Sequence, residues 1–281
     1  MTARLLTGRP VADAVWRGVE ERVGDVLAAR GRPPELALVL GDDPAAHAYA
    51  DQIGRAFGRR RLGTTVHPAP ASAELVRDLL AGLSGDSSVD GVLVLTPLSA
   101  GVATAGVIDA LDPAKDVDGQ HPASLGRLAR RQPGPVPATA LGGLRLLEHY
   151  RIPVAGRRAV VVGRSPVVGM PLALLLLAAN ATVTVCHSAT AHLEEETRQG
   201  DIVCVAVGRA GFLGAQHVRP GATVLDFGTN ALPDGSLVGD VQTDAVAGVA
   251  GAITPVPHGT GPVTTAVLAD QTTSAALGRL G

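Results

Sequence analysis

Hydrophobic residues recur at helical spacing near the start of the chain. Val15, Val19, Val23 and Leu27 stand four residues apart, which gives this segment one apolar face. The pattern predicts an amphipathic helix over residues 11–30, ended by the glycine and prolines that follow it.

Short apolar runs alternate with further helical segments after this helix. We expect buried strands over residues 36–40 and 92–95, because each is a brief apolar run bounded by turn residues. Helices are expected over residues 45–62, capped by the turn before it, and over residues 72–83, with Ser72 as N-cap.

The second part of the chain repeats β-branched apolar runs more regularly. These runs predict four strands and a last helix, over residues 159–162, 182–185, 202–207, 223–225 and 263–280. Strands that alternate with helices indicate βαβ units, so the predicted fold class is α/β with a doubly wound parallel sheet.

A chain of 281 residues is long enough for two domains. The regular pattern breaks up over residues 112–140, which hold several prolines and the cluster Arg127, Arg130 and Arg131. We interpret this segment as a connection between two domains that also lines a cleft.

Composition argues against several function classes. The net charge is −2 and aromatic residues make up 2%, which provide neither a basic field nor a stacking surface for nucleic acid. The most apolar stretch, residues 170–179, is too short to span a membrane, and residues 1–10 do not resemble a signal peptide. A cytoplasmic enzyme with a small-molecule substrate is expected.

Two residue types are rare enough to examine one by one. Cys186 and Cys204 stand in apolar runs without the spacing of metal ligands, so both are expected to be buried and no metal site is predicted. Lys115 is the only lysine, since every other basic side chain is arginine or histidine.

A glycine turn follows the strand expected at residues 159–162. Gly163 would let the backbone turn off the strand, and Gly169 would let the loop pack closely on the next helix. Ser165 stands where the usual dinucleotide motif has its middle glycine. Amides at such a helix start can face a phosphate, which indicates a nucleotide site, with an ordinary βα turn as the alternative.

The end of the next strand bears on the choice of nucleotide. NAD-selective folds usually carry an acid there, whereas this strand ends in His187-Ser188. Arg164 and Ser188 can instead bind a 2′-phosphate, which favours NADP over NAD. The alternative is that His187 and Ser188 only cap a loop.

Ordered motifs extend along nearly the whole chain. The turn at residues 163–171 reads Gly-Arg-Ser-x-x-Val-Gly-x-Pro. Further motifs are Asp43-Pro44-Ala45 followed by Tyr49, Lys115-Asp116-Val117-Asp118-Gly119, Pro137-Ala138-Thr139, Val205-Ala206-Val207-Gly208, Gly239-Asp240-Val241 and the Pro/Gly-rich loop at residues 253–262. Together they resemble the bifunctional methylenetetrahydrofolate dehydrogenase/cyclohydrolases, the FolD family.

The resemblance implies a two-domain fold with a cleft between the domains. A folate-binding substrate domain would comprise residues 1–118 and 263–281, and an NADP-binding Rossmann-type domain would comprise residues 119–262. The expected substrate is a one-carbon derivative of tetrahydrofolate, and the expected assembly is a homodimer.

The resemblance also implies roles for individual residues. Tyr49 and Asp118 would act in catalysis and bind the folate, with Gly261 and Pro262 lining its slot. The residues at NADP contacts would be Gly163, Arg164, Ser165, Gly169, Ser188, Thr229 and Thr264.

Four positions depart from the family pattern, and one of them is Ala189, where many relatives carry a basic residue beside Ser188. Ile53 stands where the family carries a catalytic Lys, and Leu95 stands where it carries the Gln that pairs with this Lys. Hydride transfer needs mainly positioning, whereas hydrolysis of the methenyl product needs a proton carrier. We therefore expect a dehydrogenase whose cyclohydrolase activity is weak or lost. His258 replaces a loop glycine, either as a tolerated change or as an added titratable group.

Two other functions remain open. A repurposed paralogue would use NAD(P) on a different, less polar substrate that suits Ile53 and Leu95. A protein without turnover would only bind folate or a nucleotide.

Overall fold

The structure is a computed structural model that describes residues 2–99 and 101–278. The chain forms two compact units. The first unit holds the described residues up to Asp13 together with Thr139–Thr264, and the second holds Ala14–Ala138 together with the described residues from Thr265 onward.

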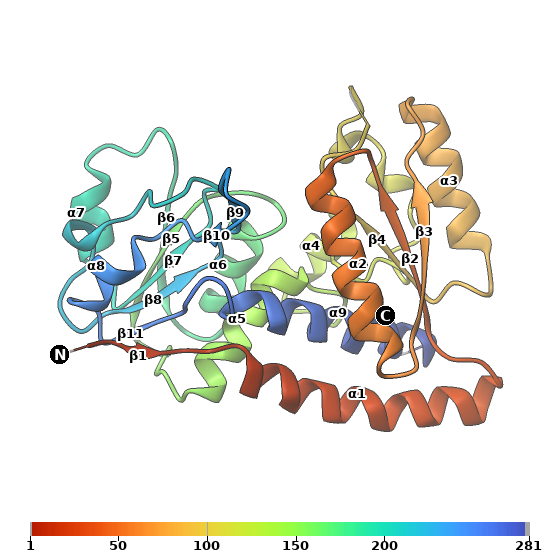
Figure 1. Cartoon of the computed structure of the whole chain (residues 1–281), viewed down its shortest axis with the longest axis horizontal. Coiled ribbons are helices and arrows are strands. Elements are labelled where there is room, and N and C mark those ends of the chain that lie inside the picture. Colours follow the sequence, from red (N-terminus) through yellow and green to blue (C-terminus); the bar gives the residue numbers. More distant parts are fainter. Residues whose placement is uncertain (1, 100, 279–281) are drawn as a thin grey trace. The chain divides into compact units, whose positions relative to one another are not determined.

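The first unit is built on a parallel six-stranded sheet (Figure 1). The parallel sheet and four of its strands were predicted, whereas the strands at residues 4–5 and 252–253 were not. Its strand order is β1-β11-β8-β7-β5-β6, and every neighbouring pair is parallel. In that order the strands are Arg4–Leu5, Ala252–Ile253, Thr223–Asp226, Ile202–Val205, Arg158–Val162 and Thr182–Cys186. The other elements of this unit are α5 (Ala138–His149), α6 (Gly169–Ala178), α7 (Leu193–Arg198), η3 (Ala215–His217), α8 (Thr243–Ala247) and the hairpin of β9 (Asn230–Ala231) and β10 (Leu237–Val238).

The core of this unit consists of the β-branched residues that predicted the strands. Val160, Val162, Val203 and Val205 are buried in one apolar cluster with residues of β8 and α8. Cys186 and Cys204 are both buried and free, which confirms their prediction as small core residues.

The second unit contains a parallel three-stranded sheet in the order β3-β2-β4. Its strands are β2 (Glu35–Leu40), β3 (Gly63–Pro68) and β4 (Gly91–Val94), and its helices include α2 (Pro44–Gly58), α3 (Ala73–Gly85), η1 (Thr104–Gly106), η2 (Ile108–Ala110) and α4 (Pro122–Ala129). Both predicted caps are present. The Ala45 amide donates to Asp43 Oδ1 at 3.0 Å, and the Leu75 amide donates to Ser72 Oγ at 3.3 Å.

Three helices contribute residues to both units, and α5 does so through Ala138 alone. The helix predicted over residues 11–30 is α1, Arg9–Arg30, and the unit boundary falls after Asp13. The helix predicted over residues 263–280 is α9, Thr260–Ala276, with the boundary after Thr264; residues 279 and 280 lie outside the described part.

The helix predicted over residues 45–62 ends early, at Gly58. Arg61 takes a left-handed φ of 62°, and the chain then enters β3. This strand escaped prediction because its Thr-Thr-Val-His sequence is only partly buried and forms no apolar run.

The proline-rich segment also contains an unpredicted helix, α4. Pro122 occupies its first turn, where proline is tolerated, and the Ala123 amide donates to His121 Nδ1 at 3.0 Å. The strand expected to reach residue 207 stops at Val205, because the Val207 amide donates to the Asp240 carboxylate instead of to a strand.

The boundaries of the two units lie at other residues than the boundaries of the two domains expected from the sequence. Strand β1 pairs with β11, so residues up to Asp13 belong to the six-stranded unit. The segment that contains α4 belongs to the three-stranded unit up to Ala138. In the described part of the chain, no helix is long and apolar enough to cross a membrane.

Candidate active site

Asp118 lies in a tight loop of the second unit and is 8% exposed. Its Oδ1 accepts a hydrogen bond from the Ala138 amide at 2.9 Å. Gly119 has a φ of 59°, and a Cβ at this position would lie 2.7 Å from Pro137. This close approach requires glycine and joins the Asp-Gly turn to the Pro-Ala-Thr segment, two motifs that lie apart in the sequence.

Two buried polar side chains hold this loop. Asp116 accepts hydrogen bonds from the amides of Gln120 and His121 and from the hydroxyl of Ser124. On α9, Gln271 donates to the Val117 carbonyl at 2.7 Å. It also exchanges two hydrogen bonds with the backbone of Val136, each 2.9 Å long. Neither residue was among the predicted site residues: Asp116 was noted only as part of the motif at residues 115–119, and Gln271 belongs to no motif.

Burial dominates the electrostatics of Asp118. It raises the pKa of this carboxyl to about 6, although the hydrogen bonds from Ala138 and Gln120 act in the opposite direction. Tyr49, on α2, has a pKa raised by burial and then by the negative charge of Asp118, against a hydrogen bond with Thr265. The phenol of Tyr49 therefore stays protonated at neutral pH.

The two aliphatic positions belong to the same unit as Asp118. Ile53 lies one helical turn after Tyr49 on α2 and is fully buried. Leu95 follows β4 directly, is 8% exposed, and its amide donates to the Val39 carbonyl at 2.8 Å. Gln120 Nε2 donates to the carbonyl of Val94, so the Asp118 loop is tied to the strand end that carries Leu95.

The single lysine of the chain has a structural role. Lys115 Nζ donates to the Leu83 carbonyl at 3.0 Å and to the Asp86 carbonyl at 2.6 Å, where α3 ends. Burial lowers the pKa of its ammonium group. The Lys115 carbonyl accepts from the Val92 amide near the start of β4, whereas Leu95 follows the other end of this strand.

In the first unit, the glycine turn lies where a nucleotide site is expected in a doubly wound sheet. Strand β5 has β6 on one side and β7 on the other, so the strand order reverses at β5. Gly163 has a φ of 124°, and a Cβ there would lie 2.2 Å from the Ala206 carbonyl oxygen, just after β7. A Cβ at Gly169 would lie 2.2 Å from the Gly163 carbonyl oxygen, which confirms the predicted close packing of turn and helix.

The proposed cofactor contacts follow several strands of this sheet at their carboxyl ends. Arg164 and Ser165 follow β5, Ser188 follows β6 and Thr229 follows β8, and all four are exposed. Ser165 Oγ accepts from the amides of Val168 and Gly169 at the start of α6. The carboxyl ends of parallel strands share one edge, so the sheet places these four residues at one edge.

The other predicted residues of this unit lie near the start of α9. Gly261 and Pro262 belong to its first turn, and Thr264 is buried with its hydroxyl donating to the Thr260 carbonyl at 3.3 Å. His258 is exposed and has a φ of 82°, a conformation that favours glycine. Its carbonyl accepts from the Gly8 amide at 2.8 Å.

Two further buried carboxylates support the carboxyl edge of the sheet. Asp240 accepts from the amides of Val207, Gly208 and Arg209 and from the Asn230 side chain. Asp226 accepts from the amides of Gly228, Asp240 and Val241, and burial raises its pKa to about 6. Sequence analysis noted the motif of Asp240 but gave neither acid a role.

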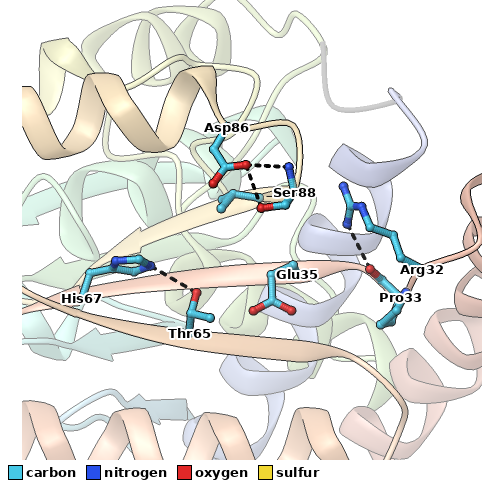
Figure 2. Close-up of a pocket in the computed structure, with 8 residues that line it drawn as sticks. Arg32, Pro33, Glu35, Thr65, His67, Asp86 and Ser88 are labelled. Carbon is cyan, nitrogen blue, oxygen red and sulfur yellow. Dashed lines mark hydrogen bonds between the residues drawn. The ribbon is translucent and has the colours of Figure 1, made fainter.

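A cavity of about 320 Å³ opens elsewhere in the second unit (Figure 2). Arg32, Pro33, Glu35, Thr65, His67, Asp86, Ser88 and Val89 line it. None of them is a predicted site residue, and Arg32 is committed to Asp90 through hydrogen bonds of 2.6 and 3.0 Å. The motif residues, and not this cavity, define the candidate active site.

Comparison with known proteins finds two family models that match successive parts of the chain. A family described as "Tetrahydrofolate dehydrogenase/cyclohydrolase, catalytic domain" matches residues 6–118. "Tetrahydrofolate dehydrogenase/cyclohydrolase, NAD(P)-binding domain" matches residues 137–279. The two units thus define a two-domain α/β enzyme with an NAD(P)-binding domain.

Individual relatives cover the whole chain. The bifunctional protein FolD of Chloroflexus aurantiacus is 47% identical, with all of both chains aligned. The bifunctional FolD structure from Campylobacter jejuni has a TM-score of 0.93 at 34% identity and covers 99% of this chain and 100% of its own. The Trypanosoma brucei enzyme, solved with NADP and an inhibitor, has a TM-score of 0.91 at 30% identity and covers 99% of this chain and 98% of its own. This chain belongs to the tetrahydrofolate dehydrogenase/cyclohydrolase family, the FolD family of one-carbon metabolism.

Proposed function

We propose that this protein oxidises 5,10-methylenetetrahydrofolate to 5,10-methenyltetrahydrofolate with NADP, and that its cyclohydrolase activity is weak or lost. The proposal rests on one observation. Asp118, the proposed folate ligand, is a buried carboxylate. In the same unit, the buried aliphatic residues Ile53 and Leu95 occupy the positions at which the family carries Lys and Gln.

The residues that would hold the folate are suited to it. Each oxygen of Asp118 accepts one hydrogen bond from the protein, which leaves acceptor capacity on both oxygens for two N–H donors of a pterin ring. Tyr49 is the aromatic side chain whose electrostatic contact with Asp118 supports a position beside the ring. Gly261 and Pro262 are proposed folate contacts on the family resemblance.

Proton transfer is the step that the second unit does not support. Ile53 and Leu95 cannot carry a proton, Tyr49 stays protonated, and hydrolysis of the methenyl carbon needs water to be activated. Lys115 cannot replace the missing amine, because its Nζ is bound to the carbonyls of Leu83 and Asp86. Hydride transfer needs no such group, since the cofactor supplies its chemistry.

The first unit fits NADP as that cofactor. When bound, NADP accepts the hydride. The turn of Gly163, Arg164, Ser165 and Gly169 would hold its pyrophosphate at the start of α6, and Ser188 with Arg164 would bind the 2′-phosphate. Thr229 and Thr264 are further proposed contacts. The two residues after β6 are His187 and Ser188, and neither is an acid, which favours NADP over NAD.

The family resemblance supports two further proposals. The protein would act in the cytoplasm, and it would assemble as a homodimer. Size-exclusion chromatography with light scattering tests the assembly, with a mass of twice 28.4 kDa expected and a mass of 28.4 kDa against it.

A steady-state assay tests the dehydrogenase step. The purified protein is mixed with 5,10-methylenetetrahydrofolate and either NADP or NAD, and the reduced cofactor is followed by absorbance. We expect reduction with NADP at a kcat/KM at least tenfold above that with NAD. A preference for NAD would overturn the cofactor assignment alone.

The same assay separates the alternative functions. If neither cofactor is reduced while NADP still binds, a repurposed enzyme with a less polar substrate is favoured. Tight folate binding without any turnover indicates a binding protein. Either result would contradict the proposed activity.

A further inference from the structure

We propose that Gln120 is a positioning residue for the folate site, which fixes the plane of the Asp118 carboxylate against the end of β4. This inference rests on the proposed function, in which Asp118 binds the folate ring. No family motif noted in the sequence includes Gln120, and it is half-buried in the loop between Gly119 and α4.

The contacts of Gln120 define this role. Its Nε2 donates to Asp118 Oδ2 at 2.9 Å and to the Val94 carbonyl at 3.0 Å. The Val94 carbonyl can only accept, as can the ionised Asp118 carboxylate, so the NH₂ end of the Gln120 amide faces both. The two amide hydrogens of Gln120 are thereby used, one on the carboxylate and one on the strand end next to Leu95.

The carboxylate is consequently held at both oxygens. Ala138 donates its amide to Oδ1 at 2.9 Å, and Gln120 donates to Oδ2 at the same distance. Two fixed donors on different oxygens stop the carboxylate from rotating about its Cβ–Cγ bond. The unused lone pairs of both oxygens then keep a constant direction, as recognition of two parallel N–H donors requires.

The hydrogen bond from Gln120 also affects the ionisation of Asp118. Asp118 interacts with the charge of Asp116 from its own loop, and Tyr49 faces it from α2. Burial and Asp116 favour the neutral carboxyl, whereas the Gln120 hydrogen bond favours the ionised form that accepts N–H donors. Removing the amide should raise the pH at which Asp118 ionises.

The test compares Gln120→Met with Gln132→Met. Methionine keeps the length of glutamine but donates no hydrogen bond, and Gln132 is an exposed glutamine in the same unit. For Gln120→Met we expect KM for 5,10-methylenetetrahydrofolate to rise about tenfold, with kcat within about twofold of the wild type. The acid limb of the kcat/KM profile should move to higher pH, and Gln132→Met should change none of these values.

A second variant and a second measurement keep the test decisive if Gln120→Met does not fold. Gln120→Glu keeps the shape of the side chain but places an acid beside Asp118, so it should raise the ionisation pH further than Gln120→Met. Carbon-13 NMR of the Asp118 carboxyl in the substrate-free protein reads this directly. The expected order of midpoints is wild type, then Gln120→Met, then Gln120→Glu.

The proposal is overturned if Asp118 titrates alike in the wild type and both variants, or if KM for the folate is unchanged in Gln120→Met. A lower kcat and a lower melting temperature, without a shifted titration, would show a structural role only. The NMR titration needs no substrate, so it still judges Gln120 if the wild type fails to oxidise the folate, a result that would count against the proposed function instead.

Discussion

Asp118 is a buried carboxylate, and its proposed role in folate binding requires the ionised form. Its pKa is about 6 in the folded protein and 3.8 in the unfolded chain, so the folded form binds more protons between these values. Ionisation of Asp118 therefore opposes folding. Its unfavourable contribution grows as pH rises from about 4 to 6 and is constant above that range.

The variant Asp118→Asn tests this sign, because asparagine does not ionise. The free energy of unfolding of the variant minus that of the wild type should be larger at pH 8 than at pH 4, by roughly 2 kcal/mol. Urea denaturation of both proteins at the two pH values measures the change, and hydrogen bonds lost by the variant cancel in this comparison. Equal differences at both pH values would mean that the Asp118 pKa is not raised.

The proposed loss of hydrolysis depends on Ile53 and Leu95. Restoring the polar pair with Ile53→Lys and Leu95→Gln should raise hydrolysis of methenyltetrahydrofolate about 100-fold, the lower end of general acid–base catalysis. Ile53 is fully buried, so the new amine would have a lowered pKa and remain able to exchange protons.

Loss of methenyl absorbance measures this gain, and Ile53→Met with Leu95→Met is the matched control, since it changes the same positions without adding a proton carrier. A folded Lys/Gln variant with no gain would show that something other than proton transfer limits hydrolysis.

At the scale of elements, α9 holds the loop that contains Asp118 in the second unit through Gln271. Its side chain makes three hydrogen bonds to the backbone of Val117 and Val136. Gln271→Leu should lower the free energy of unfolding by about 3 kcal/mol, because it leaves buried backbone groups without partners. Urea denaturation checks the value. Gln132→Leu, on the surface, should cost less than about 0.5 kcal/mol, and a similar small cost at Gln271 would refute this role.

Elements were predictable from sequence where one face is continuously apolar or a cap is explicit. Strand β5 and the Ser72 cap of α3 satisfy those conditions and were predicted almost to the residue. Strand β3 and α4 do not, because Thr64 and Thr65 are polar and Pro122 looks like a helix breaker until its place in the first turn is known. The secondary structure of such segments depends on contacts with residues far away in the sequence, which the local sequence does not show.

At the scale of the whole molecule, ordered motifs indicated the fold class and the family, and these predictions are confirmed. What the sequence did not supply is the second layer of contacts around each motif. Gln120, Gln271 and Asp240 act on backbone or on another side chain, so their function exists only once the chain has folded.

We propose that this enzyme keeps the hydride-transfer site of its family without the proton carrier that hydrolysis requires. The most direct test supplies 5,10-methenyltetrahydrofolate to the wild-type protein and compares its enzymatic hydrolysis rate with the dehydrogenase rate of the same preparation. We predict that hydrolysis is slower than the dehydrogenase step by roughly 100-fold or more. Hydrolysis that keeps pace with the dehydrogenase would contradict the account.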